Sequence, residues 1–262
     1  MSEMHPNLLN KAIKHGEVLW ELHGKYVLAI GEAAVVKISH GPVDSDIIGN
    51  LHYINTYAPQ VPTPTLLRAL TSGNRTYLFM TMAAGVTLES IWPELSSLQK
   101  LSVQSQLNEI LSVLRSNKVP DTTPLAGRVA PRIGTFTHGT CRDTRRLQRV
   151  ANGPICNESE FNDFCSDQMK STTSWVRMIR SLMKDGHRVV RTHGDLHPRN
   201  IMVEWVLQEN KASDYWEFVN VLSTVDPKSP GLADWCDYLP TEAIGSWPVE
   251  FSLDCLISRW LG

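Results

Sequence analysis

The stretch HGDLHPRNIMV, residues 193–203, decides how this sequence is interpreted. The apolar pair Val189-Val190 precedes it and the apolar triplet Ile201-Met202-Val203 ends it, so the pattern predicts a polar loop between two short buried strands. The loop holds an acid, two histidines, an arginine and an asparagine. Because loops on a rigid scaffold often carry binding and catalytic groups, this stretch is the first candidate for a functional site.

Asp195 and Asn200 lie five residues apart in this loop. A carboxylate can orient an attacking hydroxyl group or accept its proton, and an amide oxygen is a hard ligand that suits Mg²⁺. Kinase catalytic loops use an aspartate and an asparagine at this spacing as base and metal ligand. The same two residues would also suit an Asx-rich turn beside a buried histidine, so on their own they leave both interpretations open.

The whole string resembles the catalytic loop of the aminoglycoside phosphotransferase and choline kinase-like family, and within it the fungal small-molecule kinase-like proteins. The resemblance implies an α+β, two-lobed, protein-kinase-like fold. A small antiparallel β N-lobe at residues 1–82 would bind nucleotide, and a mainly helical C-lobe at residues 83–262 would carry the loop. The implied activity is ATP- and Mg²⁺-dependent transfer of a phosphoryl group to a hydroxyl group of a small molecule. Asp195 would be the catalytic residue and Asn200 a magnesium ligand.

Three short runs of β-forming residues, 17–22, 25–30 and 34–39, are separated by glycine turns and predict an antiparallel meander. Lys37 lies in the third run, where a buried ammonium costs desolvation energy unless it meets a phosphate or a carboxylate. An edge-strand lysine that points to water is the alternative. The family resemblance implies that Lys37 holds the nucleotide phosphates.

Two features of this predicted lobe depart from the family. Relatives pair the phosphate-binding lysine with a glutamate on the next helix, predicted here at residues 44–56, but that position falls on Ile47, with Asp46 beside it. The phosphate loop is also weak, because His23-Gly24-Lys25 does not form a GxGxxG pattern.

Strands predicted at residues 66–70 and 77–82 form a hairpin around a Ser-Gly-Asn turn. The end of the second strand, at Thr81 and Met82, resembles the hinge between the lobes, where backbone groups of relatives bind adenine. An ordinary connection from strand to helix is an equally good interpretation of these residues.

Apolar residues at helical spacing predict two long helices beyond the hinge. The first begins at Ser96 or Ser97, and the second spans residues 158–184. The second has a predicted apolar stripe of Trp175, Ile179, Leu182 and Met183. Residues 119–153 are interpreted as an irregular connection near the substrate side, with arginines at 142, 145, 146 and 149 on a solvated helix face.

The segment after Val203 departs most from the family, in which a hairpin and an Asp-Trp pair supply the second metal ligand. Three interpretations stay open: Asp214 completes the metal site, Glu204-Trp205 replaces the missing pair, or the ligand is absent through true loss or a wrongly spliced gene model. The last interpretation leads to an alternative function, a catalytically impaired kinase-like protein.

Composition narrows the class of partner. The chain has 25 Lys+Arg and 27 Asp+Glu, which gives a formal net charge of −2, so neither nucleic acid nor an anionic membrane is indicated. No apolar run is long enough to span a bilayer, and the first residues lack the layout of a signal peptide. Five scattered cysteines without a CxxC pair fit free thiols in the cytoplasm.

The expected cofactors are ATP and Mg²⁺, and the expected partner is a small molecule with a hydroxyl group; acceptor identity and oligomeric state stay open.

Overall fold

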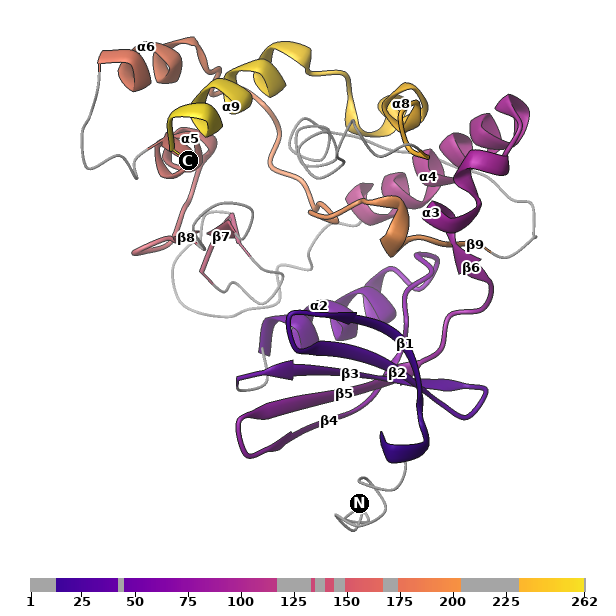
Figure 1. Cartoon of the computed structure of the whole chain (residues 1–262). Coiled ribbons are helices and arrows are strands. Elements are labelled where there is room, and N and C mark those ends of the chain that lie inside the picture. Colours follow the sequence, from indigo (N-terminus) through magenta and orange to yellow (C-terminus); the bar gives the residue numbers. More distant parts are fainter. Residues whose placement is uncertain are drawn as a thin grey trace. The chain divides into compact units, whose positions relative to one another are not determined.

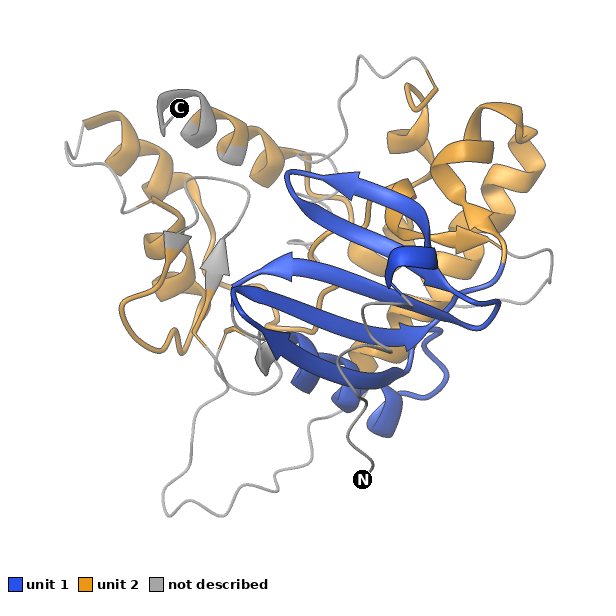
Figure 2. Cartoon of the chain, turned by 60° about the horizontal axis from the view of Figure 1, so that its bottom comes forward, with its two compact units in different colours: residues 1–84 blue, residues 85–262 orange. Residues whose placement is uncertain are grey.

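The structure is a computed structural model that describes residues 13–41, 45–116, 133–134, 140–143, 149–166, 174–203 and 231–261. The chain divides into two compact units, Met1–Ala84 and Gly85–Gly262 (Figure 2). The first unit is an antiparallel β sheet with a helix, and the second is mainly helical (Figure 1). The predicted α+β class is therefore confirmed. Within the described residues, no helix combines the length and the hydropathy that crossing a membrane requires.

The sheet of the first unit has the strand order β1-β2-β3-β5-β4, and every neighbouring pair is antiparallel. The predicted meander is confirmed as β1 (Glu17–Leu22), β2 (Lys25–Ile30) and β3 (Ala34–His40). The predicted hairpin is confirmed as β4 (Leu66–Ser72) and β5 (Arg75–Thr81). Helix α2 (Ser45–Tyr57) follows β3 within one residue of its predicted bounds and contacts β4.

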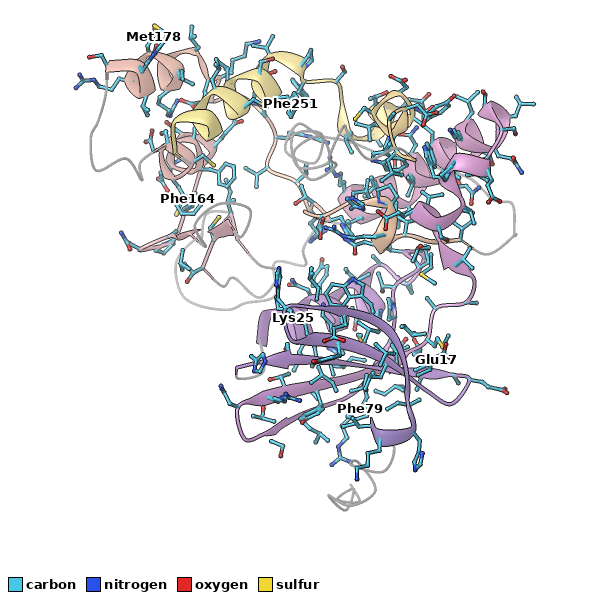
Figure 3. The ribbon with its side chains drawn as sticks, in the orientation of Figure 1. Glu17, Lys25, Phe79, Phe164, Met178 and Phe251 are labelled. Carbon is cyan, nitrogen blue, oxygen red and sulfur yellow. The ribbon has the colours of Figure 1, made fainter. Side chains whose placement is uncertain are left out.

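Strand alternation decides which residues of β3 enter the core. Val36 and Ile38 point to one face, where they pack with Leu28 and Phe79; Figure 3 labels Phe79 in this sheet. Lys37 stands on the opposite face of this strand. The central strand therefore gives one face to the hydrophobic core and presents a cation on the other.

The second unit begins with β6 (Val86–Thr87), which pairs with β9 (Met202–Val203) at the end of the loop quoted above. The first predicted helix is confirmed as α4 (Ser97–Ser116), in which Leu107, Leu111 and Leu114 are buried. The second unit also contains short helical elements: α3 (Leu88–Ile91), η1 (Trp92–Glu94), η3 (Trp235–Tyr238) and α8 (Thr241–Ile244).

The prediction of one continuous helix over residues 158–184 is wrong. The structure has two helices, α5 (Glu158–Ser166) and α6 (Ser174–Leu182). Arg180 Nε lies 2.7 Å from Asp163 Oδ1, whereas one straight helix would separate these residues by about 25 Å. Helix α6 therefore folds back against α5.

The predicted apolar stripe of α6 is also only partly correct. Trp175 and Leu182 are 50% and 58% exposed, and Met178 is exposed as well (Figure 3). Val176 and Ile179 are buried instead, and Ile179 packs with Leu253 of α9 (Pro248–Leu261). The buried face is rotated about the helix axis relative to the predicted stripe. Trp175 and Leu182 therefore lie at its exposed edge, while Met183, also predicted, packs against Ile179 and Leu253.

Two further local predictions are wrong. Residues 189–190 form no strand, and Val189 is 47% exposed, because β9 takes β6 as its partner. The arginines at 142 and 149 lie on the paired strands β7 (Arg142–Asp143) and β8 (Arg149–Val150), not on a helix. Those at 145 and 146 lie outside the described residues.

Candidate active site

Three hydrogen bonds between side chains and the backbone hold the loop at residues 193–200. His193 Nδ1 accepts a hydrogen bond from the Asp195 amide at 3.2 Å. His197 Nδ1 accepts one from the Arg199 amide at 3.1 Å and thereby caps the short helix η2 (Pro198–Asn200). Asn200 Nδ2 donates to the Asp195 carbonyl oxygen at 2.9 Å. The loop is therefore a fixed bend, in which Asp195 and Asn200 are brought together as the sequence predicted.

The outgoing end of this loop is attached to α3 (Figure 1). The Leu88 amide donates to the Ile201 carbonyl oxygen at 2.8 Å, and Met202 pairs with Thr87. Leu88 is fully buried, so this attachment is packed as well as hydrogen-bonded. Helix α3 is the scaffold that positions the polar bend.

The carboxylate of Asp195 has two unlike oxygens. Its side chain is 49% exposed, yet Oδ1 is buried and has no hydrogen-bond donor among the described residues. The nearest cation is Arg199, whose Nη2 lies 3.7 Å from Oδ1, which is too far for a hydrogen bond. Most of the exposure therefore belongs to Oδ2, which can accept a hydrogen bond from a ligand.

Asn200 has its amide nitrogen bonded to the loop backbone, which orients the side chain. Its Oδ1 is then the atom left to bind a cation, and an amide oxygen is a suitable ligand for Mg²⁺. No set of three His, Cys, Asp or Glu side chains in the described ranges could hold a metal ion. Asp214 and Glu204 lie outside the described residues, so the second ligand stays a prediction.

His197 is a buried neutral group in the centre of this loop. Burial lowers the pKa of its imidazole, and the nearby Arg199 lowers it further, against the opposing effects of Glu89 and Asp195. Because Nδ1 accepts the Arg199 amide hydrogen, the ring proton of the neutral form is on Nε2. The bend is therefore built on an uncharged histidine.

Lys37 lies in the first unit, on the central strand β3. The alternative of an edge-strand lysine is thereby excluded. Its neighbours across the sheet are Val27 on β2 and Leu78 on β5, both apolar, and the side chain is half-buried. A partly buried ammonium among apolar neighbours is stabilised by an anionic group, and the binding of nucleotide phosphates by Lys37 stays a prediction.

Thr81 and Met82 also lie in the first unit, at the end of β5. The Thr81 amide donates to the Thr65 carbonyl oxygen at 3.0 Å, and the Met82 amide donates to the Ala33 carbonyl oxygen at 2.9 Å. Both backbone donors are therefore used by the sheet. If these residues meet an adenine ring, their backbone can offer carbonyl oxygens but no N–H group.

An ion pair between the buried Lys100 and the partly exposed Asp234 fixes the far end of the α3 scaffold. Trp92 Nε1 donates to Asp234 Oδ1 at 2.9 Å, and Lys100 Nζ donates to Asp234 Oδ2 at 2.6 Å. Trp92 also packs edge-on against Trp235, and both indoles are fully buried. Asp234 is more than a hundred residues from Trp92 and Lys100 in the chain, so no local sequence pattern indicates this cluster.

Comparisons with known proteins identify the family to which this chain belongs. A family model described as the phosphotransferase enzyme family matches residues 23–212, which include the loop at 193–203. The chain belongs to the phosphotransferase enzyme family. The predicted recognition is thus confirmed at the level of the family. No curated protein matches the chain.

Solved structures of family members share the fold. The aminoglycoside phosphotransferase APH(4)-Ia is 14% identical, with a TM-score of 0.57 over 97% of this chain and 88% of that chain. An aminoglycoside-3'-phosphotransferase of type VIII is 13% identical, with a TM-score of 0.52 over 97% of each chain. These likenesses confirm the predicted kinase-like fold. The alignment with an APH(2'')-IIa complex with streptomycin and ATP covers 47% of this chain and 44% of that one, less than half of each, with 19% identity and a TM-score of 0.32.

Proposed function

We propose that the chain is an ATP- and Mg²⁺-dependent phosphotransferase that acts on a hydroxyl group of a small molecule. The observation that carries the proposal is the carboxylate of Asp195, half-exposed and incompletely hydrogen-bonded, on a bend that Asn200 closes. Family membership supports the same reaction class. A cytoplasmic location is part of the proposal, since all five cysteines are free thiols.

The proposed roles follow from the chemistry of each group. Asp195 Oδ2 accepts a hydrogen bond from the acceptor hydroxyl and receives its proton as the oxygen attacks the γ-phosphorus. The bond from that phosphorus to the bridging oxygen breaks, and its electron pair leaves with ADP. Lys37 binds the nucleotide phosphates, and the carbonyl groups of Thr81 and Met82 face the adenine amine. Nucleotide binding is thus assigned to a lobe at residues 1–82 and acceptor chemistry to residues 83–262.

The described residues fit a metal ion that arrives with the nucleotide. Asn200 Oδ1 is one hard oxygen ligand, and Mg²⁺ in kinase-type sites takes its remaining ligands from substrate phosphates, water and one further protein oxygen. When bound, Mg²⁺ would neutralise charge on the phosphates. Asp214 is proposed as the further protein ligand. Asn200 would hold the ion, while Asp195 handles the proton.

The direct test combines nucleotide binding with turnover. Wild type should show a thermal shift with millimolar Mg-ATP, because a ligand that binds the folded state raises its stability. ADP release is then measured with a panel of small amino alcohols, sugars and nucleosides. Asp195→Asn should lower turnover by about 10²–10⁴-fold, while the thermal shift remains. Asp237→Asn is the matched control, because Asp237 is an exposed aspartate of η3. Equal turnover by Asp195→Asn and wild type would overturn the proposal.

The second candidate is a catalytically impaired kinase-like protein. The residue that favours it is Ile47 on α2, because the family resemblance implies a glutamate at this position that pairs with the phosphate-binding lysine. Ile47 is 37% exposed and carries no carboxylate itself. Binding of Mg-ATP without ADP release on any acceptor of the panel would favour this candidate. The variant Ile47→Glu should then raise the affinity for Mg-ATP if the missing carboxylate is the defect.

A further inference from the structure

Arg199 occupies a defined position beside the carboxylate of Asp195. It is the middle residue of η2, and its amide is fixed by His197 Nδ1. The side chain is 46% exposed, so the guanidinium group lies on the solvent side of the bend. Among the described residues, the guanidinium group forms an ion pair with Asp195. The backbone of Arg199 is therefore held while its side chain reaches outward.

The contact with Asp195 does not engage the guanidinium group fully. The separation of 3.7 Å between Nη2 and Oδ1 exceeds a hydrogen bond, and ion pairs with this degree of exposure contribute little to stability. Arginine suits planar, bidentate recognition of phosphate oxygens, because its N–H donors lie in a fixed fork. The group therefore retains donors that a phosphate can use.

The reaction proposed above places a growing negative charge close to this group. A hydroxyl oxygen bonded to Asp195 forms a new bond to the γ-phosphorus, its proton goes to the carboxylate, and the leaving electron pair stays on ADP. Negative charge is spread over the three equatorial oxygens of the group in transfer, and a cation fixed beside them lowers the barrier. Among described residues, Arg199 is the cation that the loop itself holds next to Asp195.

We propose that Arg199 is a further catalytic residue, whose guanidinium group leaves the long contact with Asp195 and binds the equatorial oxygens of the transferring phosphoryl group. The proposal rests on the proposed function. It differs from a purely positioning role, in which Arg199 would act only by holding the Asp195 carboxylate. The two roles are separated by a ligand that mimics the transferring group and needs no acceptor.

The experiment measures thermal shifts with Mg-ADP alone and with Mg-ADP plus aluminium fluoride, a planar mimic of the phosphoryl group. The proteins are wild type, Arg199→Gln, Arg199→Lys and Asp195→Asn. Arg177→Gln is the matched control, because Arg177 is an exposed arginine of α6. Arg199→Gln should bind Mg-ADP like wild type but lose at least roughly tenfold in affinity for the fluoride complex, the loss expected for a charge-assisted hydrogen bond. Arg199→Lys should recover part of that loss, and Asp195→Asn and Arg177→Gln should show none of it.

Two results would overturn the assignment. If Arg199→Gln binds the fluoride complex as tightly as wild type, the guanidinium group does not contact the transferring group. If it loses Mg-ADP and the fluoride complex to the same extent, Arg199 binds the ADP portion instead. A wild type that binds neither Mg-ADP nor Mg-ATP overturns the proposed function itself and this inference with it, so the two failures are distinguishable.

Discussion

Asp195 and Asp234 lie in the same unit, and each faces one basic side chain, yet their surroundings differ. Both oxygens of Asp234 are hydrogen-bonded, one by the Trp92 indole and the other by the Lys100 ammonium. The hydrogen bond from Lys100, with that from Trp92, lowers the pKa of the Asp234 carboxyl group although burial opposes the shift. Asp195 has a buried oxygen without a donor and a cation 3.7 Å away.

The difference separates a structural carboxylate from one that is available for chemistry. Buried polar atoms in folded proteins are nearly always hydrogen-bonded, so an exception calls for an explanation. At Asp234 each oxygen already accepts one hydrogen bond, from Trp92 of η1 and from Lys100 of α4, and these two bonds tie the start of η3 to both helices. At Asp195 the missing donors lower stability but leave the carboxylate able to bind an acceptor. Trp235 Nε1 and Asn162 Oδ1 are also buried without a hydrogen-bond partner among the described residues. The incomplete bonding of Asp195 therefore indicates function only together with its place in the 193–203 loop.

The largest expected effect on stability is at Asp234. Asp234→Asn leaves Lys100, which is 9% exposed, without its counter-charge. The free energy of unfolding should fall by about 2–3 kcal/mol, below the usual cost of breaking a fully buried pair because the Asp234 side chain is 42% exposed. Asp195→Asn should change it by no more than about 0.5 kcal/mol. Urea unfolding of both variants gives the comparison.

Acid provides a control for that result. Because the folded-state pKa of Asp234 lies below its ordinary value of 3.8, its contribution is complete above that pH and is lost as the pH falls further. Asp234→Asn should therefore destabilise most at neutral pH and progressively less below pH 3.8. Equal unfolding free energies for the Asp195 and Asp234 variants would remove the distinction between the two carboxylates.

The sequence could predict features that depend on neighbouring residues. The strands of the first unit and the helix α4 follow from residue periodicity, which is a local property. The proximity of Asp195 and Asn200 follows from a single tight bend. The cluster of Trp92, Lys100 and Asp234 could not be predicted in this way. It joins residues more than a hundred positions apart, and only packing decides such contacts.

The wrong predictions have separate physical causes. The predicted apolar stripe covers only residues 175–183, so it carried no information on whether residues 158–174 continue the same helix. The apolar pair at 189–190 suited a strand, but a strand also needs a partner, and β9 pairs with β6. The role proposed for Arg199 depends on a distance to Asp195 that periodicity does not contain.

Gly194 offers a smaller test, because it perturbs the Asp195 bend through the backbone alone. Its φ is +77°, and a Cβ added there would have no atom within 4 Å. Gly194→Ala should therefore cost about 1–2 kcal/mol of unfolding free energy from the left-handed conformation. Gly186→Ala is the matched control, since Gly186 has equal space and no positive φ; it should be neutral or slightly stabilising. If both variants unfold alike in urea, the bend does not depend on this backbone conformation.

The smallest effect should come from His197, and mild acid should reveal it. The folded state holds the pKa of this imidazole below its ordinary value of 6.5, chiefly through burial. Above that pH the imidazole is neutral in both the folded and the unfolded state. As the pH falls below it, the unfolded chain takes up a proton that the folded loop resists, so stability declines.

The variant His197→Asn removes the titration and keeps an oxygen that can accept the Arg199 amide hydrogen. Urea midpoints between neutral pH and mild acid should fall more steeply for wild type than for this variant. Because the contribution of Asp234 is lost only below pH 3.8, the Asp195 bend weakens at a pH where the Asp234 ion pair is intact. Parallel curves for the two proteins would show that His197 does not hold the bend in its neutral form.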